Sequence, residues 1–479
     1  MRLNRIAVIL LAAAFAVYAA ISLGVFRDYP FSMDEYNYRY QAEIFASGRL
    51  HVDAPPWSGP LIETHTLFVG GKVSSKYPPL FSVILTPTVL LGVSGLVNPL
   101  ISVISLYILF LILGRLFEKR IAGITCAIAA TNIYFVGYAA SYFAQSLTLL
   151  LCLLSLLFLM RHFEKPSSSN ILLSAVFLAG LVLTRPLDAV LHVFFLAVIT
   201  FAKLKWSREF FKTCVVLGAG IALGTLLLMT YNHVQSGSFA LAGYPLWEKE
   251  FTVNPRGASI WANYLQNGRK FFGLLLGRYF LSPLGAGAIA LCLAGVLFGR
   301  SVWARGGLLY LLAFILAYNF HSQNGWPQYG SRYWYPGWIG IALMTAAGVR
   351  ALEGGLSRSA SVSRFLPAVL TLLLVSQVYW SGAALMNYRS RFDYIFRMRE
   401  IAESHCPEQS IIPLEKLVRK YQRAAPPYAV ILDLRRNPFL NGSRLYVNSE
   451  ASARELERQL PGYHVCTSEF ADELYRTEW

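Results

Sequence analysis

The sequence predicts a polytopic α-helical membrane protein with about eleven hydrophobic spans and a small α/β domain at its C-terminus. Of the 479 residues, 55% are hydrophobic and only 14% are charged, which leaves more apolar surface than a soluble domain can bury. The apolar residues form runs of about 20 residues, the length of a transmembrane helix. Basic clusters separate alternate runs, as the positive-inside rule requires of cytoplasmic loops.

The spans follow the apolar runs in chain order. The first run, residues 5–26, is long enough to span, so we expect an anchor rather than a cleaved signal peptide. Further spans are expected at residues 97–116, 120–139, 143–160, 171–185, 187–203, 213–231, 282–300, 304–320, 334–351 and 364–387.

The run at residues 79–93 is apolar but short, and it contains Pro79 and Pro87. We interpret it as a re-entrant or interfacial helix, because a spanning helix needs about 20 residues. Counting it as a span would put every later basic cluster on the side opposite to the N-terminal arginines. The clusters are Arg2 and Arg5; Arg115, Lys119 and Arg120; Arg161 and Lys165; Lys203, Lys205, Arg208 and Lys212; Arg300 and Arg305; Arg350, Arg358 and Arg364.

This topology predicts an inner or plasma membrane protein with a cytoplasmic N-terminus. Residues 1–390 form the transmembrane domain, with outer loops at 27–78 and 232–281, and residues 391–479 form the extracytoplasmic α/β domain. The latter contain 13 Lys or Arg and 13 Asp or Glu, so the net charge of +16 belongs to the membrane part. In the membrane part, the positive charge is explained by cytoplasmic loops or by attraction to anionic lipid. This explanation disfavours a nucleic-acid partner.

The C-terminal domain has two candidate strands, residues 428–434 and 444–447, a candidate helix at 451–460 and a last strand at 464–468. Cys406 and Cys466 lie in this polar tail, whereas the other four cysteines lie in apolar runs. The two would form a disulfide in an oxidising compartment. The alternative is two unpaired thiols.

The first outer loop contains adjacent acids, Asp34 and Glu35, after a Ser32 placed to cap a helix. Neighbouring helical side chains diverge by about 100°, so we expect one acid to act and the other to support it. The alternative is that both acids only cap and solvate the helix.

Three cations on the outer side are candidate phosphate ligands. Lys76 precedes the short apolar run, where it would bind a phosphate or merely snorkel. Arg185 and Arg332 are lone cations in outer turns, and a guanidinium suits an anionic lipid head. The alternative for Arg185 is structural pairing with Asp188.

The outer segments are rich in tryptophan and tyrosine, as expected of an interfacial belt or of rings that stack on a sugar. Tyr244, Trp247 and His321 are the candidate contacts to the acceptor or sugar. The sequence contains no glycine-rich phosphate loop, HExxH helix or GxSxG elbow, which disfavours nucleotide-driven and hydrolase functions.

The order of these motifs resembles the GT-C superfamily, and more narrowly the bacterial glycosyltransferases akin to protein O-mannosyltransferases and lipid A aminoarabinose transferases. The resemblance covers roughly residues 1–390. It rests on the acidic pair after the first span, Lys76-Tyr-Pro-Pro-Leu, Thr184-Arg-Pro, Tyr231-Asn-His-Val-Gln-Ser-Gly-Ser and Tyr329-Gly-Ser-Arg-Tyr.

The resemblance implies inverting transfer of a sugar from a polyprenyl-phosphate donor to a glycolipid, polysaccharide or protein acceptor. Asp34 would deprotonate the acceptor hydroxyl with Glu35 in support. The donor phosphate would be held by Lys76, Arg185, Arg332 and Tyr333. Related enzymes often carry a second acid in the next outer loop, where this chain has the uncharged Gln145.

The chemistry requires no cofactor, because a phosphate-linked sugar already has a good leaving group. A divalent metal is compatible with it but is not indicated by a Cys/His cluster. The alternative function is a transporter or lipid flippase, which would need polar residues deep within several spans. A non-catalytic anchor would leave Asp34 and the outer arginines unexplained, so we favour the transferase.

The topology gives a first testable prediction. A reporter that works only outside the cytoplasm should be active when fused after Trp479, because an odd number of spans separates the two termini. The matched fusion after Lys165, within an expected cytoplasmic loop, should be inactive. Activity of a cytoplasm-specific reporter at Trp479 would contradict the topology.

Overall fold

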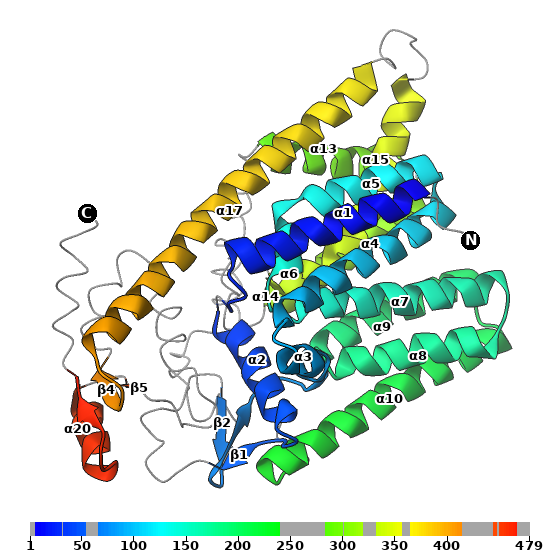
Figure 1. The fold of residues 1–479 in the computed structure, drawn as a ribbon. Coiled ribbons are helices and arrows are strands. Elements are labelled where there is room, and N and C mark those ends of the chain that lie inside the picture. The colour runs from blue at the N-terminus through cyan, green and yellow to red at the C-terminus, as the bar shows by residue number, and fades with distance from the viewer. Residues whose placement is uncertain are drawn as a thin grey trace.

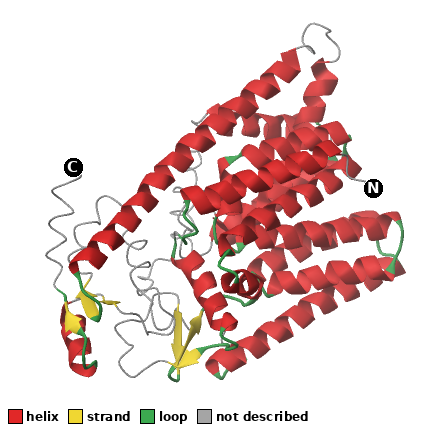
Figure 2. Cartoon of the chain, viewed as in Figure 1, coloured by secondary structure: helices red, strands yellow, loops and turns green. Residues whose placement is uncertain are grey.

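The computed structural model describes residues 5–30, 32–53, 66–239, 283–299, 301–319, 332–356, 365–413, 444–447 and 450–466. Helices dominate these residues, and the few strands form two separate small sheets (Figure 2). Most helices run roughly side by side across the view in Figure 1 and form a bundle.

Each expected span coincides with a helix, or with two helices in one case. Lys119–Thr131 and Ile133–Ala140 (α5 and α6) form one pair bent by 65°, because Asn132 between them has an extended backbone and caps α6. The other helices are α1 (Arg5–Ala20, continued by the π-helical turn η1, Ile21–Val25), α4 (Val97–Leu116), α7 (Gln145–Glu164), α8 (Ser168–Val182), α9 (Pro186–Leu204), α10 (Arg208–Ser236), α13 (Pro283–Leu297), α14 (Val302–Asn319), α15 (Trp338–Leu356) and α17 (Phe365–His405).

Not all of these helices are long enough to cross a membrane. Within the described ranges, five helices are sufficiently long and apolar, or six if the bent pair is one span. The α8 helix has only 15 residues, fewer than the roughly 20 that a bilayer requires. The structure therefore supports a helical membrane protein. The number of about eleven spans remains a prediction.

Small residues let the helices approach closely. A Cβ atom at Gly220 of α10 would lie 2.3 Å from the carbonyl oxygen of Ala175 in α8, and one at Gly224 would lie 2.7 Å from that of Ala179. These positions therefore accept only glycine at this spacing. Small residues one turn apart are typical of helix contacts in lipid, where packing replaces the hydrophobic drive between helices.

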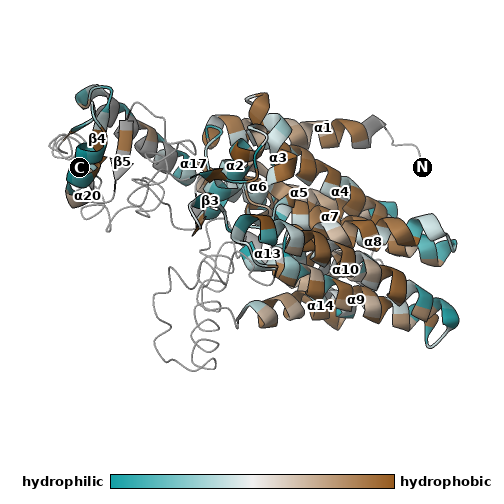
Figure 3. Cartoon of the chain, turned by 90° about the horizontal axis from the view of Figure 1, so that it is seen from below, coloured by the Kyte–Doolittle hydropathy of each residue, from teal (hydrophilic) through white to brown (hydrophobic). Residues whose placement is uncertain are grey.

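The two ends of the bundle differ in charge and structure. At one end, ion pairs join Arg115 to Glu164 at 3.3 Å and Arg120 to Glu353 at 3.5 Å, linking the ends of four helices. Hydrophilic loops also mark this end in Figure 3, while the helices between the ends are hydrophobic. Arg115 and Arg120 belong to one of the basic clusters that the sequence assigns to the cytoplasm, and both lie at this end of the bundle.

The opposite end carries the first outer segment. It contains α2 (Met33–Ala46), an antiparallel sheet of order β1–β3–β2 and the short α3 (Leu80–Leu90). The strands are β1 (Val52–Asp53), β2 (Thr66–Val69) and β3 (Lys72–Ser75), with Val73 paired to both Val52 and Phe68. Figure 1 views α3 nearly end-on while α7 and α8 cross the view, so this 11-residue helix lies crosswise to the bundle.

The 41-residue α17 leads away from the bundle to a second small sheet (Figure 1). This sheet is parallel, in the order β5–β4–β6, and α20 (Glu450–Gln459) packs against β4. Its strands are β4 (Ser410–Pro413), β5 (Arg444–Val447) and β6 (His464–Val465). β5 and α20 correspond to the expected strand at 444–447 and helix at 451–460, and β6 covers the start of the expected strand at 464–468. β4 was not predicted, and the expected strand at 428–434 falls outside the described residues.

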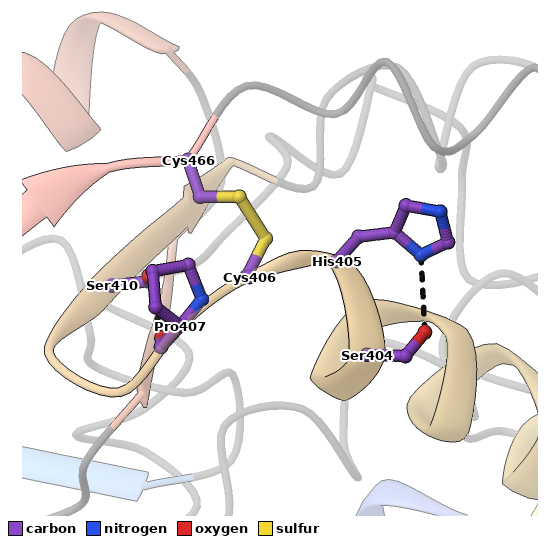
Figure 4. The surroundings of a disulfide bond; sticks show 6 residues. All are labelled: Ser404, His405, Cys406, Pro407, Ser410 and Cys466. Carbon is purple, nitrogen blue, oxygen red and sulfur yellow. Dashed lines mark hydrogen bonds between the residues drawn. A yellow bond between two sulfur atoms is a disulfide. The ribbon is translucent and has the colours of Figure 1, made fainter.

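A disulfide joins Cys406 at the end of α17 to Cys466 after β6 (Figure 4). The bridge spans 60 residues of sequence, and the Cys406 side chain is buried. Such a long closed loop would stabilise the sheet by about 4 kcal/mol in the chain-entropy model.

Thiol labelling tests this bridge. A variant with Cys126, Cys152, Cys214 and Cys292 replaced by serine, unfolded without reductant, should take up no thiol reagent. After reduction, the same variant should take up two labels per chain. Two labels before reduction would show that the bridge does not form in the cell.

Candidate active site

The start of α2 sets the direction of the two adjacent acids. Ser32 caps the helix as predicted: its Oγ accepts a hydrogen bond from the Glu35 amide at 3.3 Å, and the Glu35 carboxylate accepts one from the Ser32 amide at 2.9 Å. The other oxygen of Glu35 accepts from the amide of Tyr142 at 3.1 Å. Glu35 is only 1% exposed, so its carboxylate fixes α2 to the segment before α7.

Asp34 points away from these contacts, because adjacent side chains on a helix diverge by about 100°. Its Oδ1 accepts a hydrogen bond from the Tyr77 hydroxyl, and its Oδ2 accepts one from Nη1 of Arg332. The Asp34 side chain is 15% exposed. Of the two acids, Asp34 is therefore the one that meets another predicted site residue, Arg332.

Lys76 and Tyr77 connect β3 to α3 and lie against α2. The amide of Ser75 donates to Oε1 of Gln41 at 2.8 Å, which ties this connection to the helix. The Tyr77 ring lies 4.6 Å from the ring of Tyr38, and Nζ of Lys76 lies 5.4 Å from the Tyr77 ring. Lys76 is buried, so it does not extend freely into solvent.

Arg185 has an acidic partner one turn along α9. Its Nε donates to Oδ2 of Asp188 at 2.5 Å and its Nη2 donates to the Tyr318 hydroxyl at 3.0 Å. The same hydroxyl donates to the other oxygen of Asp188. The pairing that the sequence left open is thus present in the structure.

Arg332 is paired as well, through Asp34. The expectation that Arg332 is a lone cation is therefore wrong, whereas for Arg185 the alternative of pairing with Asp188, which the sequence left open, is the one present in the structure. Sequence spacing does not reveal a partner 298 residues away, and a buried guanidinium is costly without a counter-charge.

Tyr333 connects the two arginines. Its ring centroid lies 5.2 Å from Cζ of Arg332 and 5.7 Å from Cζ of Arg185, and it stacks on Tyr318 at 4.7 Å. Cation–π contacts of this kind hold guanidinium groups in place. We call Asp34, Tyr77, Arg185, Arg332 and Tyr333 the acid–arginine cluster.

The surroundings of the cluster shift the pKa values of Arg332 and of the neighbouring Tyr38. Burial acts to lower the pKa of Arg332, but Asp34 together with Tyr333 and Tyr77 outweighs it, and the pKa is raised well above its ordinary value. Burial is also the main reason that the pKa of Tyr38, against the cluster, is raised. Arg332 is therefore cationic near neutral pH, and Tyr38 contributes an uncharged side chain beside the cluster.

Other predicted residues do not join the cluster. Tyr244, Trp247 and His321 fall outside the described residues. Gln145 is buried at the start of α7. Within the described ranges, no group of three or more His, Cys, Asp or Glu side chains is placed to hold a metal ion.

Sequence reasoning missed two contributors, Tyr77 and Tyr318. Tyr77 stands in the Lys76-Tyr-Pro-Pro motif already noted, so its position was a usable signal. Tyr318 lies inside an apolar run without any motif, and only the packing of α14 reveals it.

Comparison with known proteins shows which folds this architecture is similar to. Residues 78–231 match the family described as dolichyl-phosphate-mannose-protein mannosyltransferase. No curated protein sequence matches the chain significantly. The structure of ArnT from Cupriavidus metallidurans in the apo state aligns over 98% of this chain and 91% of its own, with a TM-score of 0.56 and 14% identity. The chain has a GT-C fold.

Two further GT-C structures agree. ArnT from Cupriavidus metallidurans bound to undecaprenyl phosphate aligns over 98% of this chain and 91% of its own, with a TM-score of 0.54 and 13% identity. The Archaeoglobus fulgidus oligosaccharyltransferase tethered with an acceptor peptide aligns over 92% of this chain and 64% of its own, with a TM-score of 0.51 and 13% identity. The predicted resemblance to the GT-C superfamily is confirmed.

The buried pair in α9 gives a stability prediction. Asp188→Asn should destabilise the protein by about 3–5 kcal/mol, because it leaves the Arg185 charge unpaired beside a fully buried position. Unfolding in mixed micelles would measure this loss. The matched control is Glu164→Gln, whose side chain is 55% exposed and which should cost at most about 1 kcal/mol. Equal effects of the two variants would contradict the structural role of Asp188.

Proposed function

We propose that this protein is a membrane glycosyltransferase that moves a sugar from a polyprenyl-phosphate donor to a hydroxyl acceptor. The observation that carries the proposal is the acid–arginine cluster. Its charged members come from α2, from the start of α9 and from the segment before α15, yet they meet at one end of the bundle. One carboxylate and two guanidinium groups there match the needs of the reaction, a base and a phosphate clamp.

The cations serve the departing phosphate. When the bond between the sugar carbon and the phosphate oxygen breaks, its electron pair leaves with the phosphate, and a diester monoanion becomes a monoester dianion. Arg185 and Arg332 would stabilise this added charge, together with Lys76, which lies beside Tyr77. Guanidinium groups bind phosphate oxygens in pairs, and Tyr333 keeps the two arginines close to each other.

Asp34 is the proposed base. Its carboxylate accepts the proton of the acceptor hydroxyl while that oxygen bonds to the sugar carbon opposite the leaving phosphate, so transfer inverts the sugar. Glu35 supports Asp34 without touching the substrate, since both of its oxygens accept backbone hydrogen bonds. The active and supporting roles thus follow from the direction of each side chain.

We further propose that the reaction takes place on the extracytoplasmic face. Arg115 and Arg120 lie at the bundle end opposite to α2, and the positive-inside rule assigns that end to the cytoplasm. The N-terminus would then be cytoplasmic, and the disulfide-bonded C-terminal elements would lie outside, where disulfides persist.

The donor and acceptor classes follow the solved GT-C structures. ArnT has been solved with undecaprenyl phosphate and the oligosaccharyltransferase with an acceptor peptide. For this chain we propose a polyprenyl-phosphate sugar as donor and leave lipid, polysaccharide and protein as acceptor classes. Tyr244, Trp247 and His321 remain the proposed contacts to the sugar or acceptor.

A transporter or flippase is the alternative, and one observation favours it. Inside the bundle, Ser155 Oγ lies 2.8 Å from His192 Nε2, and His192 Nδ1 lies 2.9 Å from the Tyr310 hydroxyl. All three side chains are buried. Because the three side chains are buried and hydrogen-bonded to one another, their polar groups already have partners, so we prefer the transferase.

Replacing the base tests the function. Asp34→Asn should lower sugar transfer about 100-fold to 10,000-fold, because the amide cannot accept the hydroxyl proton. Transfer would be followed as label passing from a polyprenyl-phosphate sugar into membrane acceptors extracted from a deletion strain. Glu43→Gln, on the same helix and paired with Arg39, is the matched control and should retain activity. Full transfer by the Asp34 variant would refute the assignment.

A further inference from the structure

We propose that Arg332 changes partner during the reaction: it holds Asp34 before the donor binds, and it then turns to the donor phosphate, which releases Asp34 to act as the base. This inference rests on the proposed function and concerns the regulation of the same site. Donor binding and activation of the base would thereby be coupled through one guanidinium group.

Both carboxylate oxygens of Asp34 are engaged in the structure. Tyr77 donates to Oδ1, and Arg332 donates to Oδ2. A carboxylate bonded to a cation is a weak base, because the cation favours its ionised form. Asp34 in this arrangement is therefore held in position but is poorly disposed to accept a proton.

The ion pair between Asp34 and Arg332 differs from the one between Arg185 and Asp188. Asp34 and Arg332 belong to segments 298 residues apart, and their side chains are 15% and 12% exposed. Arg185 and Asp188 are three residues apart on one helix, and Asp188 is 0% exposed with a second donor in Tyr318. Arg185 is 11% exposed, much like Arg332, so the two pairs differ in their carboxylates. Asp188 is fully buried and held by two donors, whereas Asp34 is partly exposed, so a competing anion can replace Asp34 more readily than Asp188.

A phosphate is a suitable competitor for Arg332. Its oxygens accept two parallel N–H bonds from one guanidinium, and the bonds are charge-assisted. The exchange never leaves the arginine without a counter-charge, so it avoids the penalty of an uncompensated buried cation. Tyr333, whose hydroxyl lies 3.4 Å from Nη2 of Arg332, stays beside it throughout.

The exchange leaves Asp34 oriented. Tyr77 keeps its bond to Oδ1, so the carboxylate does not rotate freely, and Oδ2 becomes available to the acceptor hydroxyl. The base is thus released only when a phosphate occupies the cations. The acceptor is deprotonated next to a donor that is ready to react.

The exchange predicts that replacing the proposed catalytic base, Asp34, strengthens donor binding. In the wild-type protein, the phosphate must displace Asp34 from Arg332. Asp34→Asn removes this competing charge, so undecaprenyl phosphate should bind about tenfold more tightly than it does to the wild type, the gain of one charge-assisted hydrogen bond that no longer has to be broken. Arg332→Ala should bind it about tenfold more weakly.

The experiment is a double-mutant cycle on the full chain in nanodiscs, with the Kd of undecaprenyl phosphate as the readout. The proteins of the cycle are the wild type, Asp34→Asn, Arg332→Ala and the double variant, and Arg185→Ala is measured beside them to test the phosphate clamp. Glu43→Gln controls for the loss of one negative charge from α2, and undecaprenol, which lacks the phosphate, controls for binding of the lipid tail. Melting temperatures confirm that each variant is folded.

The expected result is tighter binding by Asp34→Asn that disappears in the Arg332→Ala background, with no change for Glu43→Gln or with undecaprenol. Unchanged or weaker binding by Asp34→Asn would overturn the exchange, as would a gain that persists without Arg332. If Arg332→Ala and Arg185→Ala both bind undecaprenyl phosphate as the wild type does, the proposed phosphate clamp fails too. Weaker binding by Arg332→Ala with no gain for Asp34→Asn would refute the exchange alone.

Discussion

A charge next to the hydrocarbon core needs a partner, and this constraint organises the functional end of the molecule. The desolvation of a guanidinium is repaid only by a counter-charge and by hydrogen bonds to its remaining donors. Arg185 meets both needs with Asp188 and Tyr318, and Arg332 meets them with Asp34 and Tyr333. These pairs also join α2, α9, α14 and the start of α15, so the segments that carry charge are the ones held together.

The adjacent acids on α2 divide two tasks that one carboxylate could not perform. Glu35 closes the helix cap and binds the amide of Tyr142, which fixes the rotation of α2 about its axis. Asp34 is then turned toward Arg332 by helix geometry alone. A buried, fully satisfied carboxylate therefore positions a partly exposed one, and the chemistry proposed for Asp34 depends on the structural role of its neighbour.

The shared arginine gives the site an order of events. With the membrane-lipid donor proposed here, a base exposed before the donor arrives would have no reaction to serve. An ion pair that a phosphate can open keeps the carboxylate occupied until then. In this proposal the two cations have different roles: Arg185 keeps its buried partner Asp188, and Arg332 exchanges Asp34 for the phosphate.

The elements that depend on local pattern and on the bilayer could be predicted from the amino-acid sequence. It gave the helical membrane class, the positions of the apolar helices, the cap at Ser32, the short crosswise helix after Pro79, and the strand and helix at 444–447 and 451–460, because hydrophobic run length, capping spacing and turn chemistry act over few residues. The resemblance carried by its motifs pointed to the superfamily.

Only the tertiary structure decided which of these residues meet. It paired Arg332 with Asp34 across 298 residues, brought Tyr77 and Tyr318 to the cluster and separated the direction of Asp34 from that of Glu35. Ion pairs and ring contacts between distant segments depend on how the helices pack, and packing depends on close approaches such as that of Gly220 to Ala175. No local pattern in the chain encodes the contact between Asp34 and Arg332, which is why Arg332 looks solitary in the sequence and is paired in the fold.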